Sequence, residues 1–129
     1  MTEPEGTRFT RDHEWARWDG DLVRVGISDY AQDAVGDLVF IDLPNGGAVV
    51  SAGSAVAEVE STKTVSSVLA PVSGEIVEVH VEIGGNPDLI NSDPYGEGWM
   101  FAIRPSDPAE FDRLMDSGSY AQHVKEVSG

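Results

Sequence analysis

The chain has 129 residues, 40% of them hydrophobic, which fits one domain with one ordinary core. It contains no cysteine, which excludes a disulfide framework, a thiolate nucleophile and cysteine-ligated metal sites. Its 23 acidic and 8 basic residues give a net charge of −15, which opposes binding to nucleic acid and to anionic membranes. This charge fits either a plain acidic cytoplasmic protein or a shuttle whose partners present basic faces.

The opening residues are not expected to act as a targeting signal. Residues 1–6 are acidic, and they lack both the apolar core of a secretory signal and the arginines of a transit peptide. No apolar run approaches the ~18 residues needed to span a bilayer. We therefore expect a cytoplasmic protein, although a mature form that had lost a targeting segment would look the same.

Most of the chain predicts short β-strands separated by turn signals, as in an all-β sandwich or barrel. Asn45-Gly46 predicts a tight turn, because both residues tolerate a positive φ. In the segment 75–81, valines at alternate positions predict an apolar face that ends at Val81, with His80 on the polar face. The predicted strands are 22–27, 38–43, 54–60, 65–69, 75–81 and 99–103.

Two helical regions interrupt the predicted strands. Ser28 can cap a short helix near 28–35, which Gly36 would close. Further helices are expected near 107–126, where Asp107-Pro-Ala-Glu110 has the order of a capping box with proline at the first helical position. Gly118 is expected to interrupt this region, and Asn86–Gly98 is expected to be a polar loop long enough for a binding role.

Lys63 is the candidate functional residue. Two apolar strands flank the polar segment 60–64, so Lys63 is expected at the tip of a hairpin, away from the core. Lysine occurs at only one other position, Lys125, whereas six of the eight basic residues are arginine. Arginine can replace a solubilising charge but offers no acylatable amine, so the amine of Lys63 is expected to matter. Most lysines in turns are ordinary solvated charges, and the hairpin and the low lysine count weaken that interpretation without excluding it.

The chain resembles the lipoyl-bearing H-protein of the glycine cleavage system, over about residues 9–105. Positions 62 and 64, often Val and Ala in that family, are threonines in this chain, and His80 stands where Asn is common. The residues that carry the resemblance are Phe9-Thr-Arg-Asp-His-Glu-Trp15, Gly26-Ile-Ser-Asp-Tyr-Ala-Gln32, Val35-Gly-Asp37, Leu43-Pro44, Glu60-Ser-Thr-Lys63, Ala70-Pro71 with Gly74, and Asn86-Pro-Asp-Leu-Ile-Asn91 leading into Asp93-Pro-Tyr-Gly-Glu-Gly-Trp99.

The resemblance implies a mostly β barrel-sandwich hybrid with peripheral helices. It also implies that residues 1–129 form a single lipoyl-carrier domain, with a core at about 9–105 and a helical extension at 106–129. Lipoate would be attached covalently to Lys63. Glu60, Ser61 and Thr62 would form the tip motif that the lipoyl-attaching enzyme recognises.

The resemblance further implies a monomeric carrier that is not an enzyme. It would take an aminomethyl group from glycine decarboxylase (P-protein) to aminomethyltransferase (T-protein), and dihydrolipoyl dehydrogenase (L-protein) would reoxidise it. The loop 86–99 would be one wall of a cleft for the loaded arm.

Four alternatives remain open from the sequence. A biotin carrier usually has methionines beside the lysine, where this chain has Thr62 and Thr64. A lipoyl domain of a 2-oxoacid dehydrogenase usually adjoins Pro/Ala-rich linkers, which this chain lacks. A lipoyl relay protein that donates lipoate to other complexes would use the same hairpin. An unmodified acidic interaction module would tolerate Lys63→Arg.

The remaining candidate residues favour structural roles. The three histidines are far apart and lack the spacing of a metal site, so we interpret them as hydrogen-bonded surface residues. The three tryptophans lie beside predicted strands and are expected to pack in or near the core. The chain has no nucleophile elbow, P-loop or dinucleotide-binding glycine run.

Overall fold

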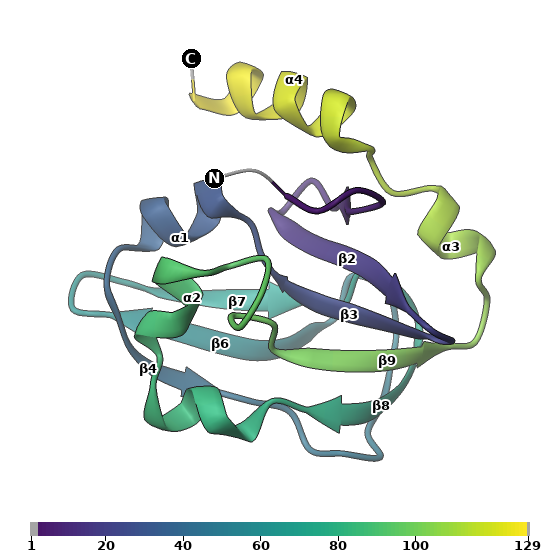
Figure 1. Ribbon diagram of the computed structural model, residues 1–129, viewed down its shortest axis with the longest axis horizontal. Helices are drawn as coiled ribbons and strands as arrows, with labels where there is room; N and C mark the ends of the chain where they lie inside the picture. The colour runs from purple at the N-terminus through teal and green to yellow at the C-terminus, as the bar shows by residue number, and fades with distance from the viewer. Residues whose placement is uncertain (1–2, 129) are drawn as a thin grey trace.

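Two antiparallel sheets form the centre of the computed structural model, which describes residues 3–128 (Figure 1). Met1 and Thr2 of the acidic opening segment, and Gly129 of the expected extension, lie outside the described residues. The larger sheet has the order β1 (Arg8–Phe9), β2 (Glu14–Asp19), β3 (Leu22–Ile27), β9 (Phe101–Pro105), β8 (Gly74–Val79) and β5 (Val49–Val50). The smaller sheet has the order β4 (Leu38–Asp42), β6 (Ala55–Ser61) and β7 (Val65–Leu69).

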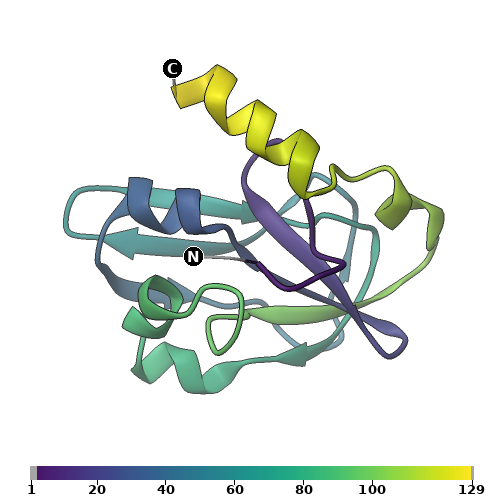
Figure 2. The same ribbon diagram turned by 45° about the horizontal axis from the view of Figure 1, so that its top comes forward.

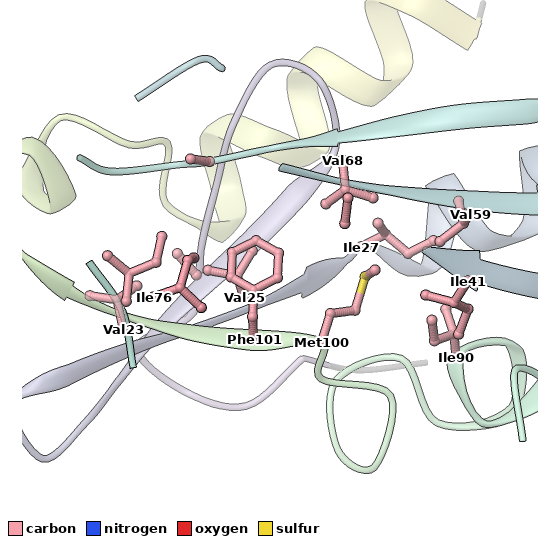
Figure 3. Packing of buried hydrophobic residues seen from close by; sticks show 14 of the residues in the cluster. Val23, Val25, Ile27, Ile41, Val59, Val68, Ile76, Ile90, Met100 and Phe101 are labelled. Carbon is pink, nitrogen blue, oxygen red and sulfur yellow. The ribbon is translucent and has the colours of Figure 1, made fainter. Parts of the chain in front are cut away.

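The core lies between the two sheets. Val23, Val25 and Phe101 from the larger sheet belong to one buried cluster with Val59 and Val68 from the smaller one, and Figure 3 shows these side chains between the strands. All five side chains are at most 1% exposed. Such a side chain contributes about 1.5–3 kcal/mol to folding, so this shared core is what holds the two sheets together.

The predicted strands are confirmed, but three strands were missed and one ends early. β1 and β5 are two residues long, and β2 carries charge at both ends, so none has a clear alternating pattern. β8 ends at Val79, and Val81 instead begins the short 3₁₀-helix η1 (Val81–Gly85). As a result Val81 is 66% exposed and His80 only 8% exposed, the reverse of the predicted faces. The early end of the strand accounts for this, because the two-residue alternation stops at Val79, whose side chain still packs against the core.

The first helix, α1 (Asp29–Val35), begins and ends as the sequence predicts. The Ser28 hydroxyl accepts the Ala31 amide at 3.1 Å. Gly36 closes the helix with a φ of 94°, and its amide donates to the Gln32 carbonyl at 3.0 Å. A positive φ disfavours residues that have a Cβ atom, so glycine suits this position.

The C-terminal region contains α3 (Ala109–Asp112) and α4 (Ser117–Ser128). Figures 1 and 2 both show α4 lying across the N-terminal strands, at the edge of the larger sheet. Gly118 lies inside α4, so the predicted interruption there is wrong. The predicted capping box forms only in part: the Asp107 carboxylate accepts the Ala109 amide, but Glu110 accepts the amide and hydroxyl of Ser73 instead.

The segment 86–98 is not an open loop. It contains helix α2 (Asp88–Ser92), whose Ile90 is fully buried in the core. The sequence prediction missed this helix because it is a single short turn flanked by proline and glycine. The turn predicted at Asn45-Gly46 is present, but the positive φ of 90° falls on Gly47.

Candidate functional site

Lys63 lies in the turn between β6 and β7, as the hairpin prediction required. Glu60 and Val65 are the paired residues nearest the turn, and the Ser61 amide donates to the Thr64 carbonyl at 2.9 Å. Figures 1 and 2 show this turn protruding at one end of the molecule, beside α1. Lys63 is exposed, so its amine is accessible to another protein.

Ser61 fixes the conformation of this turn from beneath. Its side chain is buried, and its hydroxyl donates to the Val35 carbonyl at 2.7 Å. The same oxygen accepts the amides of Lys63 at 3.2 Å and Thr64 at 3.3 Å. One hydroxyl therefore joins the turn to the C-terminal end of α1 and satisfies backbone groups at both places. This arrangement makes Ser61 a positioning residue for the lysine.

Gly36 provides the surface on which the lysine side chain rests. A Cβ atom built at Gly36 would lie 3.0 Å from Cε of Lys63 and 3.6 Å from Nζ. The absence of a side chain therefore lets the lysine stem cross the backbone at the end of α1. The sequence predicted Gly36 only as a helix end, because its proximity to Lys63 comes from the tertiary fold.

Asn91 of α2 holds the connection between α1 and β4 in place. Its amide nitrogen donates to the Gly36 carbonyl at 3.0 Å and to the Gln32 side chain at 2.9 Å. Its side-chain oxygen accepts the Leu38 amide at 2.9 Å. A carboxamide has two donor and two acceptor positions, and three of these four are used here. Asn91 is one of the residues that resemble the H-protein family, but the sequence predicted no role for it.

The other tip residues lie around Lys63 in two different environments. Glu60 and Thr62 are exposed, whereas Ser61 is 5% exposed. The structure therefore leaves Glu60 and Thr62 available to a partner, while Ser61 faces the protein.

Two of the three histidines are buried, so their interpretation as surface residues is wrong for those two. The expectation that the histidines lie far apart is wrong for His13 and His123, whose rings stack with centroids 5.6 Å apart. His80 and His123 are 8% and 6% exposed, and each ring bonds a backbone carbonyl. The Nδ1 atom of His13 lies 2.8 Å from the Tyr120 hydroxyl, and this bond joins α4 to the β1–β2 connection. No group of three metal-ligating side chains occurs within residues 3–128.

The tryptophans pack as expected. Trp15 is fully buried and Trp18 is 38% exposed, with its ring against Phe111. The ring nitrogen of Trp15 donates to the Pro94 carbonyl at 2.8 Å, and thus ties the segment after α2 to the larger sheet.

The described part of the chain has surface hollows in at least two places. One, of about 390 Å³, lies where the N-terminal segment meets the start of α4. The other, of about 280 Å³, lies on the outer face of the smaller sheet. Residues 86–99 line neither. Across residues 3–128, every helix is too short or too polar to cross a membrane.

Comparisons with known proteins agree with one another. The family model described as glycine cleavage H-protein matches residues 7–127. The chain is 52% identical, over 95% of both chains, to the glycine cleavage system H protein of Thermus thermophilus. It is 48% identical, over 98% of both, to that of an Anaeromyxobacter species. A crystal structure of a glycine cleavage system H protein from Mycobacterium marinum matches with a TM-score of 0.87, at 43% identity, over 95% of this chain and 98% of the other.

The two antiparallel sheets and the match to a solved structure define a barrel-sandwich fold of the lipoyl-carrier type, which confirms the predicted fold class. The chain belongs to the glycine cleavage H-protein family. Members of this family are lipoate-carrying subunits of the glycine cleavage system rather than catalytic enzymes, so this chain has the carrier role and interacts with enzymes of that system.

Proposed function

We propose that lipoate is attached to Nζ of Lys63, so that this residue bears the group that the carrier transports between enzymes. The observation that carries the proposal is the position of Lys63, the only lysine in a turn that the fold holds rigidly at one end of the molecule. The other lysine, Lys125, lies in the last turn of α4. Acylation needs an accessible amine, and the hairpin presents one.

The lipoyl group would supply the chemistry: a disulfide able to take up the aminomethyl group as glycine decarboxylase releases carbon dioxide. Aminomethyltransferase would pass the one-carbon unit to tetrahydrofolate with release of ammonia, and dihydrolipoyl dehydrogenase would return the dithiol to the disulfide. The chain contributes attachment, reach and presentation. About twelve bonds separate Cα of Lys63 from the sulfur atoms, which gives a reach of roughly 15 Å.

A rigid base is what makes this reach useful. The bonds from Ser61 to Val35 and from Asn91 to Gly36 fix the turn relative to α1 and α2, so the arm sweeps from one defined origin. A partner that docks beside the turn then meets the arm at a predictable distance. We expect the partners to bind weakly and in turn, since one arm has to serve three active sites.

The proposal also assigns the exposed tip residues Glu60 and Thr62, with the buried Ser61, to recognition by the lipoyl-attaching enzyme. It treats residues 1–129 as one monomeric carrier domain that works in the cytoplasm. The acidic surface, with a net charge of −15, supports encounters with partners that present basic faces.

The test is mass spectrometry of the intact protein from cells that lipoylate their other lipoyl proteins fully, followed by peptide mapping. We expect one lipoyl group on Lys63, and none in a Lys63→Arg variant. Lys125→Arg is the matched control and should be lipoylated like the wild type. An unmodified Lys63 would contradict the proposal, and a biotin-sized shift would indicate a carboxyl carrier instead.

A further inference from the structure

The outer face of the smaller sheet carries two rows of exposed side chains next to the lysine turn. In the row nearest the turn, Glu60 of β6 pairs with Phe40 of β4 and with Val65 of β7. Directly paired residues of antiparallel strands share a face, and neighbouring strands lie about 4.8 Å apart, so this row is roughly 10 Å wide. The second row is Asp42, Glu58 and Ser67, in the same register.

The first row contains large apolar side chains that are exposed to solvent. Phe40 and Val65 are each 55% exposed, and Val39, the extra residue where the register shifts, is 54% exposed. The residues that alternate with this face, Ile41 and Val59, are buried. The face is therefore open to solvent, and an exposed apolar group of this kind favours contact with another protein.

The second row carries a charge arrangement that lowers the stability of the isolated chain. Asp42 and Glu58 lie directly opposite each other, and like charges in that position destabilise a sheet. No ion pair reaches Asp42, Glu58 or Glu60 from any residue in the range 3–128. A basic partner would relieve this repulsion. The hollow of about 280 Å³ lies over the same row, bounded by Asp42, Ala55–Glu58 and Ser67.

The reach of the reacting group selects one partner among the enzymes that use Lys63. An enzyme that acts on the dithiolane meets it at the end of an arm of roughly 15 Å and can dock without covering the strands. An enzyme that acylates Nζ meets a bare lysine, whose amine is at most about 6 Å from its own Cα. That enzyme has to cover the turn closely, and Phe40 and Val65 are in the first row it reaches.

We propose that the outer face of β4, β6 and β7, defined by Phe40, Val65, Asp42 and Glu58 around Glu60, is the docking surface for the lipoyl-attaching enzyme. That enzyme would place an apolar contact over Phe40 and Val65 and basic side chains beside Asp42 and Glu58. This inference rests on the proposed attachment at Lys63, and it extends recognition from the tip motif to the sheet face behind it.

The test measures lipoylation of the purified, unmodified chain by a lipoate–protein ligase supplied with lipoyl adenylate. We expect Phe40→Thr/Val65→Thr to raise KM about tenfold, the size expected when central interface contacts are lost, with kcat unchanged. Asp42→Asn/Glu58→Gln should raise KM and weaken its dependence on salt. This second variant should unfold at the same temperature as the wild type or at a higher one. If the two acids only stabilised the fold, the variant would instead unfold at a lower temperature.

The matched control is Val49→Thr/Glu75→Gln. Val49 is 84% exposed and pairs with the exposed Glu75, so it offers the same apolar and acidic combination on the larger sheet. It should leave KM unchanged. An unchanged KM in the Phe40/Val65 variant would overturn the docking surface. So would normal lipoylation combined with a selective defect toward glycine decarboxylase, because the face would then serve another partner. Failure of the wild type itself to be lipoylated would instead overturn the proposed function.

Discussion

Ser61 and Gly36 show how single residues set the position of the lysine. A buried hydroxyl that serves three backbone groups cannot be replaced by a longer or an apolar side chain without leaving one of them unpaired. Glycine at position 36 combines a positive φ with the close approach of the lysine stem, and each of these features alone disfavours a side chain.

Ser61→Ala is expected to lower the free energy of unfolding by about 1–3 kcal/mol, because the Val35 carbonyl loses its donor and the turn amides lose their acceptor. Hydrogen exchange at the amides of Lys63 and Thr64 should become faster. Chemical denaturation and exchange mass spectrometry would measure both effects. Ser51→Ala, at an exposed serine in the loop before β6, should change neither.

Gly36→Ala is expected to cost about 1 kcal/mol or more of stability, since alanine is strained at a φ of 94°. The new methyl group should also displace the lysine stem and change the rate at which Lys63 is lipoylated. The control is Gly84→Ala, where a Cβ atom would meet no other atom within 4 Å. Equal stability losses in the two variants, measured by denaturation, would contradict this account.

At the scale of the elements, α2 connects the core to the α1–β4 connection beneath the hairpin. Ile90 anchors it in the core, and Asn91 bonds both sides of the α1–β4 connection. The short helix is therefore a support for the lysine turn, although it is distant from Lys63 along the chain.

Asn91→Ala is expected to lower stability by about 2 kcal/mol, because the Gly36 carbonyl and the Leu38 amide lose their partners. Lipoylation of Lys63 should slow as the connection beneath the lysine loosens. Thermal unfolding and single-turnover lipoylation would measure the two effects. Ser92→Ala, at an exposed position in the same helix, is the control, and a loss of the same size there would contradict the assigned role of the Asn91 hydrogen bonds, because alanine by itself favours a helix.

At the scale of the whole molecule, buried ionisable groups give stability a dependence on pH. Glu14 of β2 is 1% exposed, and burial raises its pKa from 4.5 to about 7, although the Thr10 hydroxyl and the Leu69 amide bond to it. Burial also lowers the pKa of His13, and the nearby His123 lowers it further. Both groups therefore favour their neutral forms in the folded protein.

The free energy of unfolding is expected to fall as pH rises from 4.5 to 7, because folded Glu14 retains a proton that the unfolded chain releases. The loss is about 3 kcal/mol over this range. His13 acts in the opposite direction, so that stability is lost as pH falls below 6.5. Denaturant unfolding at several pH values, compared between the wild type and Glu14→Gln, isolates the glutamate. Parallel pH curves would show that Glu14 does not titrate in this range.

Patterns that are local in the sequence determined much of this protein. Apolar runs predicted the main strands, Ser28 and Gly36 predicted the limits of α1, and the apolar strands on both sides of the polar segment 60–64 predicted the hairpin. Each of these depends on residues within a few positions of one another, where backbone preference and side-chain period act directly.

Only the tertiary structure decided how the lysine is held and which surface surrounds it. Ser61 meets Val35 across 26 positions, and Asn91 meets Gly36 across 55. Phe40 comes beside Glu60 only through the pairing of β4 with β6. The burial of His80 depended on the end of β8 at Val79, and α2 on the burial of Ile90. Such contacts form because distant segments share one core, and no period or motif within a single segment records them.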